Sequence, residues 1–261
     1  MCIRDSVGVD ADGIVSIDEI VNAILPETVL ISIMLANNEI GTLQPVKKVV
    51  EIANKRGILV HTDAVQCLGK IELDVVDLGV DFLSLSAHKF YGPKGIGALY
   101  VKEPRALPSL IIGGGQEKNR RAGTENVSAI AGMGLAAENS IKSLTKKVNT
   151  LLSLEERFKR GLNKFHKSSI LNGNQSKKLP GLLSISFPGT KSGVLMNKLD
   201  REGISVSNGS ACGSGDIKPS PVLSAIGLDH ITNLSTLRFS FGSSNTNDQI
   251  DYLLSKLESM L

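Results

Sequence analysis

The stretch DFLSLSAHKFYGPKG, residues 81–95, decides the fold of this chain. Its first six residues, 81–86, are mostly apolar and bounded by polar residues, a pattern that indicates a buried strand of a parallel sheet. Lys89 follows where that strand ends, with glycine and proline behind it. This places the lysine at the carboxyl edge of the sheet, where open α/β sheets bind their ligands. Taken alone, Lys89 is better interpreted as a surface lysine in a turn, and the residues around it favour the ligand site.

Two further apolar runs lie upstream, and each ends at polar side chains. GILVHTD, residues 57–63, ends in the carboxylate of Asp63, and TVLISIMLA, residues 28–36, leads into NNE at 37–39. Between the two runs Pro45 opens an amphipathic helix. Strand, helix and strand therefore alternate, which predicts βαβ units and a mostly parallel sheet in an α/β fold.

The second half of the chain predicts a smaller α/β layer. IGALYV, residues 96–101, is expected to add one more strand to the first sheet, and the chain becomes helical from Ser128 onward. LLSISF at 182–187 and TLRFSF at 236–241 have the composition of strands, and a helix is expected between them at 194–199.

Composition and charge exclude several classes of function. The 261 residues carry a net charge of +3, which is too small to imply a nucleic-acid or acidic-membrane partner, and Trp is absent. No apolar stretch approaches the roughly 20 residues of a membrane span. The three cysteines show no paired or metal-ligand spacing, so we expect no disulfide framework, no metal site and a reducing, cytoplasmic location.

The lysine and the carboxylate at the ends of neighbouring strands suit one kind of cofactor. A pyridinium cofactor needs an aspartate to keep its ring nitrogen protonated and a lysine to hold its aldehyde as a Schiff base. Asp63 and Lys89 are the candidates for these roles. The alternative for Asp63 is a helix N-cap at a strand-to-helix turn. His61 is interpreted as a core or supporting histidine and is left out of the site.

Cys212 and Arg238 are candidates for contact with a substrate. Cys212 lies in SNGSACGSG, residues 207–215, a stretch too rich in glycine and serine to pack, so its thiol is expected to be exposed and reactive. Cys67, beside Val65 and Leu68, is expected to be a small buried residue. Arg238 alternates with apolar neighbours on its predicted strand, and its planar guanidinium suits a carboxylate, although a surface salt bridge is the alternative.

Five motifs together resemble the cysteine desulfurases of the NifS/IscS type, which are fold type I pyridoxal phosphate (PLP) enzymes of the class V aminotransferase superfamily. The resemblance runs from about residue 7 to the C-terminus. The motifs are NNEIG at 37–41, HTDAVQ at 61–66, SLSAHKFYGPKGIGALYV at 84–101, RAGT at 121–124 and SNGSACGSG at 207–215.

The resemblance implies a role for each matching residue. Lys89 would hold PLP and move the substrate Cα proton, and Cys212 would form a persulfide. The remaining matches are Asp63 at the ring nitrogen, Gln66 at the phenolic oxygen with Asn38 nearby, Ser86 and His88 at the phosphate, Thr124 at the phosphate of the neighbouring subunit, and Arg238 at the substrate carboxylate.

The implied reaction converts L-cysteine to L-alanine and leaves a persulfide on Cys212. The resemblance also implies a homodimer and a sulfur-acceptor protein, either a scaffold for iron–sulfur clusters or a relay for tRNA thiolation. Two alternatives stay open at this point. One is another class V PLP enzyme, a selenocysteine lyase or an aminotransferase, and the other is a catalytically incompetent piece that acts only in a dimer or scaffold.

The resemblance also predicts a division of the chain into domains. Residues 1–6 match nothing in the family and are interpreted as an extraneous leader. Residues 7–145 are expected to form part of a PLP-binding large domain, and residues 146–261 a small C-terminal domain that carries the cysteine loop. The family's N-terminal part has no counterpart here, so the chain is expected to be N-terminally truncated and, by itself, to bind PLP weakly or not at all.

Overall fold

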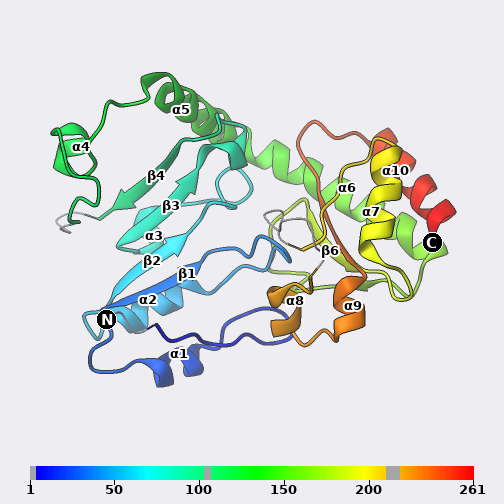
Figure 1. The fold of residues 1–261 in the computed structure, drawn as a ribbon, viewed down its shortest axis with the longest axis horizontal. Coiled ribbons are helices and arrows are strands. Elements are labelled where there is room, and N and C mark those ends of the chain that lie inside the picture. Colours follow the sequence, from blue (N-terminus) through cyan, green and yellow to red (C-terminus); the bar gives the residue numbers. More distant parts are fainter. Residues whose placement is uncertain (1–3, 103–106, 210–217) are drawn as a thin grey trace. The chain divides into compact units, whose positions relative to one another are not determined.

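The computed structural model describes residues 4–102, 107–209 and 218–261, which divide into two compact units (Figure 1). The parallel-sheet unit comprises residues 26–35 and 46–144. The antiparallel-sheet unit comprises residues 1–25, 36–45 and 145–261. The antiparallel-sheet unit therefore includes residues 1–25 and 36–45, which the predicted division places in domain 7–145 or in the leader. The two units differ in these segments from the predicted domains 7–145 and 146–261. That division into domains stays a prediction.

The parallel-sheet unit contains a four-stranded sheet in the order β1-β2-β3-β4. Its strands are β1 (Leu30–Met34), β2 (Leu59–Asp63), β3 (Phe82–Ser86) and β4 (Gly97–Val101). β1, β2 and β3 are parallel, which confirms the predicted mostly parallel sheet, whereas β4 is antiparallel to β3. Residues 87–96 between β3 and β4 are too few for a parallel crossover, which takes roughly a dozen residues or more, so the chain turns back on itself.

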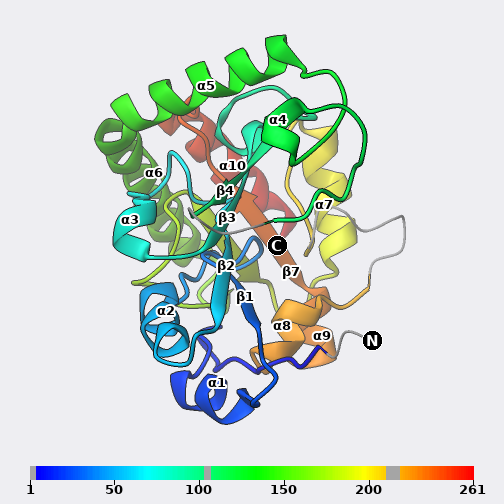
Figure 2. The ribbon, with the colours of Figure 1, turned by 90° about the vertical axis from the view of Figure 1, so that its left-hand side faces the viewer.

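Helices cover one face of this sheet. α2 (Val46–Asn54) and α3 (Val75–Leu78) lie on the same side of the sheet (Figure 2), and α2 contacts β2, whose Val60 is fully buried. The opposite face carries polar residues together with exposed apolar ones, among them Leu30 at 46% and Leu99 at 47% exposure. The sheet is therefore apolar toward its helices and mixed on its other side.

A short helical segment continues directly from β3. This segment, η1 (Ala87–Phe90), packs against α5 (Val127–Lys142), where the Ser140 hydroxyl donates to the Phe90 carbonyl oxygen at 3.3 Å. A Cβ atom at Gly92 would lie 2.9 Å from the Ala87 Cβ, so only glycine allows this close approach. The short α4 (Gln116–Asn119) precedes α5.

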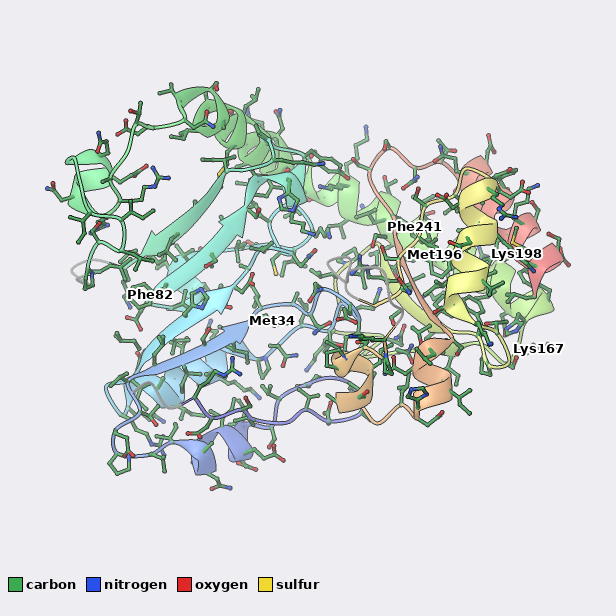
Figure 3. The ribbon with its side chains drawn as sticks, viewed as in Figure 1. Met34, Phe82, Lys167, Met196, Lys198 and Phe241 are labelled. Atoms are coloured by element: carbon green, nitrogen blue, oxygen red, sulfur yellow. The ribbon has the colours of Figure 1, made fainter. Side chains whose placement is uncertain are left out.

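The antiparallel-sheet unit is built on a three-stranded sheet of β5 (Ile170–Leu171), β6 (Leu182–Ser186) and β7 (Thr236–Ser240), in that order and with antiparallel pairing. Its helices are α1 (Ile17–Ala23), α6 (Leu144–Phe165), α7 (Ser192–Arg201), α8 (Pro221–Ala225), α9 (His230–Leu234) and α10 (Asn247–Met260). One face of β6 and β7 packs on α6, α7 and α10 around Phe158, Phe187 and Phe239. On α7, Met196 packs against this core while Lys198 is exposed (Figure 3).

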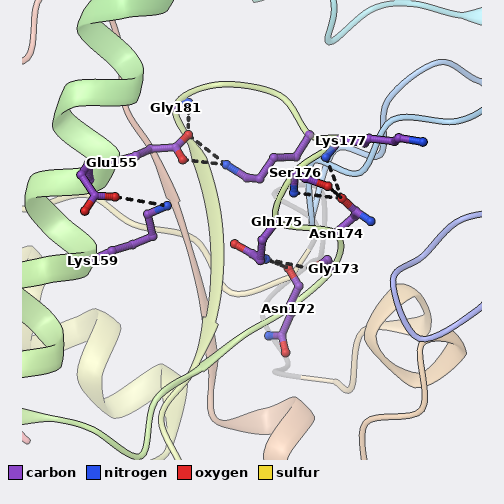
Figure 4. A network of polar contacts seen from close by, with 11 residues as sticks. Glu155, Lys159, Asn172, Gly173, Asn174, Gln175, Ser176, Lys177 and Gly181 are labelled. Atoms are coloured by element: carbon purple, nitrogen blue, oxygen red, sulfur yellow. Dashed lines mark hydrogen bonds and ion pairs between the residues drawn. The ribbon is translucent and has the colours of Figure 1, made fainter.

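A buried ion pair ties α6 to the segment that enters β6. Glu155 accepts hydrogen bonds from Lys178 Nζ at 2.8 and 2.9 Å and from the Gly181 backbone N–H (Figure 4). Both charged side chains are less than a tenth exposed. Burial lowers the pKa of Lys178, and the Glu155 carboxylate acts in the opposite direction. Since removal of one partner would leave the other charge buried, this pair is expected to matter for folding.

We predict that Glu155→Ala lowers the free energy of unfolding by about 3–5 kcal/mol, because Lys178 and the Gly181 N–H lose their buried partner. Glu138→Ala, which removes the exposed i,i+4 pair with Lys142, should cost less than about 1 kcal/mol. Urea unfolding of the two variants measures the difference. Equal losses would contradict the role assigned to the buried pair.

Candidate active site

The carboxyl edge of the parallel sheet brings together the residues predicted to hold a cofactor. Asp63 is the last residue of β2, and in the register of the sheet it lies opposite Ser84 of β3. Ser86 ends β3 two residues farther on, at the same edge. Phe82 lies at the amino end of β3 and Met34 at the carboxyl end of β1, so these two residues mark the two ends of the parallel strands (Figure 3). Asp63 and Ser86 therefore lie at one edge of the sheet on neighbouring parallel strands.

Lys89 is held at that edge by η1. The residues on either side of the exposed pair His88 and Lys89 are Ala87 and Phe90, which are both fully buried and anchor the segment. The chain then reverses at Tyr91, whose φ of 69° is left-handed, and the Gly92 N–H donates to the Ala87 carbonyl at 2.9 Å. The lysine is therefore presented to solvent immediately after β3 rather than along a longer mobile loop.

A hydroxyl and an imidazole lie beside each other next to this lysine. Ser86 Oγ and His88 Nδ1 are 2.9 Å apart, and the His88 side chain is exposed. The hydroxyl can donate to an oxyanion, and the imidazole can do so through whichever ring nitrogen carries hydrogen. The two residues that the resemblance implies as phosphate contacts are two positions apart in the sequence and in contact in the structure.

Asp63 begins a turn rather than a helix. Its Oδ1 accepts the Val65 N–H at 2.9 Å, and the Cys67 N–H donates to the Ala64 carbonyl oxygen at 2.9 Å within the same turn. The alternative interpretation of Asp63 as a helix N-cap is therefore wrong, because turns and not a helix occupy residues 65–70. The carboxylate is exposed, and Gln66 is half-buried in the turn that follows it.

His61 connects three strands on the face that carries Asp63. Its Nδ1 lies 2.8 Å from Ser32 Oγ on β1, and its Nε2 lies 2.8 Å from Ser84 Oγ on β3. Burial lowers the pKa of His61, with Asp63 acting in the opposite direction, so the ring is neutral at pH 7. A neutral imidazole has one donor and one acceptor, which matches two hydroxyl partners. Sequence reasoning missed this contact, because only the register of the strands reveals it.

Thr124 lies in the exposed loop before α5 and is not joined to the other predicted residues. The preceding residue, Gly123, has a left-handed φ of 106° and donates its N–H to Gln116 Oε1 at 3.1 Å. In the described part of the chain, no hydrogen bond connects Thr124 to Asp63, Ser86 or Lys89. Its predicted contact with a neighbouring subunit stays a prediction.

The antiparallel-sheet unit holds Asn38 and Arg238. Arg238 points away from the apolar core face of β7, as its alternation with Leu237 and Phe239 predicted. Its Nη1 donates to the Asn38 carbonyl oxygen at 3.1 Å and to the Gly209 carbonyl oxygen at 3.3 Å. The contact to Asn38 is thus through the backbone, while the predicted cofactor contact of the Asn38 side chain stays a prediction.

The structure describes only one of the two cysteines that the sequence predicted to differ in exposure. Cys67 is fully buried, and burial raises the pKa of its thiol to about 12, so it is a poor nucleophile at neutral pH. Its prediction as a small buried residue is confirmed. Cys212 lies outside the described residues, and its predicted reactivity stays a prediction.

Two further properties describe the rest of the molecule. No group of three or more His, Cys, Asp or Glu side chains with the geometry of a metal site occurs in residues 4–102, 107–209 and 218–261. Over the same residues, no helix has the length and apolar character needed to span a membrane.

Comparison with known proteins gives a consistent family. Residues 5–253 match the family described as Aminotransferase class-V. A cysteine desulfurase IscS from Clostridium botulinum is 45% identical over 255 residues, which cover 97% of this chain and 64% of that protein. A solved NifS-like protein superposes with a TM-score of 0.90 at 37% identity, over 98% of this chain and 67% of the other.

A second solved structure, of SspA in complex with cysteine, has a TM-score of 0.75 at 35% identity and covers 92% of this chain and 66% of its own. The chain thus spans just under two thirds of the length of the C. botulinum relative. It belongs to the aminotransferase class V family and is similar over nearly its whole length to cysteine desulfurases of the IscS and NifS type.

Proposed function

We propose that this protein is a PLP-dependent cysteine desulfurase, which takes sulfur from L-cysteine and leaves L-alanine. The observation that carries the proposal is the placement of Asp63 and Lys89 at one edge of a parallel sheet, in a chain of the class V family. An aspartate and a lysine at that edge are the two groups that a pyridinium cofactor with an aldehyde requires.

The residues present fit PLP by their chemistry. Asp63 offers a carboxylate for a protonated ring nitrogen, Lys89 offers an amine for the aldehyde, and Ser86 with His88 offers an adjacent hydroxyl and imidazole for the phosphate. The class V family is PLP-dependent. Gln66, half-buried in the turn after Asp63, is assigned to the phenolic oxygen. When bound, the cofactor supplies an electron sink for the bonds at the substrate Cα.

A second role is assigned to Lys89 after the substrate amine has taken its place at the cofactor aldehyde. Its free amine is assigned to take the proton from the substrate Cα and to return a proton later in the reaction, as a general base and then a general acid. Because η1 is anchored by buried residues on both sides of Lys89, the amine moves on its own side chain while its backbone stays fixed.

Arg238 and Cys212 are assigned to the substrate. Arg238 binds the α-carboxylate, for which its guanidinium is suited. The Cys212 thiolate attacks the substrate sulfur, so an S–S bond forms while the substrate C–S bond breaks and its electron pair stays with the substrate carbon. Protonation of that carbon gives alanine, and the protein keeps the sulfur as a persulfide. The sulfur is oxidised and the carbon reduced, and no external oxidant is needed.

Cysteine as the substrate is supported by the names of the relatives, including a structural neighbour solved with cysteine. A homodimer in the cytoplasm and a sulfur-acceptor protein, either an iron–sulfur scaffold or a tRNA-thiolation relay, complete the proposal. Thr124 is assigned to the phosphate held by the other subunit of that dimer.

We predict that borohydride treatment of the chain with excess PLP fixes a pyridoxyl group on Lys89, because reduction traps even a weakly held aldehyde. Peptide mass spectrometry locates the modified lysine. Lys89→Ala should lose the adduct, whereas Lys94→Ala, a control at an exposed lysine in the following turn, should keep it. Labelling spread evenly over the exposed lysines would contradict the assignment of Lys89.

We predict that Cys212→Ala reduces alanine and sulfide formation from L-cysteine to the level without protein, while PLP attachment to Lys89 is retained. Cys67→Ala is the matched control and should keep the activity, because that thiol is buried and its pKa of about 12 leaves it protonated. Alanine is measured by chromatography and the persulfide by mass spectrometry. Undiminished sulfide production by the Cys212 variant would rule out the proposed nucleophile.

A further inference from the structure

The turn that carries NNEIG brings Glu39 into the interior of the antiparallel-sheet unit. Asn37 Oδ1 accepts the N–H groups of Glu39 at 2.8 Å and Ile40 at 3.0 Å, and the Gly41 N–H closes the turn on the Asn37 carbonyl. Gly41 has a left-handed φ of 79°, which glycine adopts without strain. The Glu39 side chain is only 4% exposed, and none of the functions assigned above uses it.

The Glu39 carboxylate contacts Ser220, which lies three residues after segment 210–217 and immediately precedes α8. Ser220 Oγ donates to Glu39 Oε2 at 2.6 Å and at the same time accepts the N–H groups of Val222 and Leu223 at the start of the helix. Asn233 accepts the Ser220 N–H at 2.8 Å and donates to its carbonyl oxygen at 2.9 Å. Every polar group of Ser220 is therefore engaged, and Glu39 is the charged member of the set.

Arg238 holds the residues that precede the same segment. Ser207 and Arg238 exchange backbone hydrogen bonds of 3.2 and 2.6 Å, and Arg238 Nη1 donates to the Gly209 carbonyl at 3.3 Å. The same Nη1 also contacts the Asn38 carbonyl, next to Glu39 in the chain. The NNEIG turn and β7 thus contact the residues on both flanks of segment 210–217.

The two flanks also lie side by side. A Cβ atom added at Gly209 would lie 3.5 Å from the Ser220 Cβ and 3.6 Å from Glu39 Oε2. Residues that are eleven positions apart in the chain therefore meet at Glu39. A carboxylate buried here is costly unless its hydrogen bonds are made, so the contact to Ser220 is expected to be worth more than an exposed one.

We infer that Glu39 is a positioning residue, which through Ser220 fixes the flanks of the segment that carries Cys212. This inference rests on the proposed function, since a thiol that must reach a substrate sulfur benefits when both ends of its segment are held in place. This role of the NNEIG glutamate is independent of cofactor binding. Glu39 itself touches neither substrate nor cofactor in the proposed reaction.

Hydrogen exchange measured by mass spectrometry on the whole chain tests the inference. Glu39→Ala should speed exchange at residues 207–209 and 220–223 by about tenfold to a hundredfold relative to the rest of the unit, the range expected for a lost hydrogen bond to a charged group. Glu39→Gln keeps an acceptor oxygen for Ser220 and should restore much of the protection. With L-cysteine and PLP, the kcat of the Ala variant should fall with little change in KM.

Glu155→Ala is the matched control, because it removes another buried carboxylate of the same unit. It should speed exchange around Gly181 and evenly elsewhere, with no excess at the two flanks. If Glu39→Ala does not fold, a double-mutant cycle of Glu39→Gln and Ser220→Ala replaces it, with a coupled effect on flank exchange as the expected result.

Unchanged flank exchange in Glu39→Ala, a rise shared equally by the whole unit, or additive effects in the cycle would each overturn the inference. Exchange is read without cofactor or substrate. A chain that releases no sulfide in any form would therefore contradict the proposed function while leaving the role of Glu39 to be decided by the exchange data.

Discussion

The parallel pairing of β1, β2 and β3 is the constraint on which the proposed cofactor contacts depend. Because these strands run in one direction, their last residues share an edge, and Asp63, Ser86 and Lys89 reach that edge without any long loop. A slip of β2 by one residue would turn Asp63 to the helix-covered face. His61, hydrogen-bonded to Ser32 and Ser84 on both neighbouring strands, holds the register on the face where Asp63 lies.

In the antiparallel-sheet unit, the two faces of one sheet have different roles. Leu183, Ile185 and Leu237 belong to the apolar core, while Ser184 and Arg238 lie opposite each other on the other face. The stability of the unit therefore comes from one side and its proposed contact with substrate from the other. The NNEIG turn adds a buried carboxylate and a backbone carbonyl to that polar side, so a motif that is local in sequence connects elements that are distant in the chain.

The sequence predicted the elements well, because their signals are local. At the start of α1, Ser16 Oγ accepts the Glu19 N–H at 3.3 Å, a contact typical of a serine three residues before a glutamate. Apolar runs predicted β2 and β3, and the position of Lys89 after β3 predicted its place at the sheet edge. Gly92 and Pro93 mark a turn here, but the reversal into β4 also depends on the left-handed φ of Tyr91, which is not a glycine.

The contacts that sequence reasoning could not find are those between distant residues. The partners of His61 are 29 and 23 residues away in the sequence, and only the strand register defines them. The contact of Glu39 could not be predicted, because its partner Ser220 is 181 residues farther along the chain. Asp63 was open to interpretation as a helix cap because a strand followed by a turn and a strand followed by a helix begin alike in sequence.

The most direct measurement is a crystal structure of the protein after reduction of PLP onto Lys89. The placement of both residues at one sheet edge predicts a pyridine nitrogen within hydrogen-bonding distance of a carboxylate oxygen of Asp63. A ring fixed on Lys89 whose nitrogen faces water or another side chain, with Asp63 out of reach, would contradict the assignment of these two residues to one cofactor.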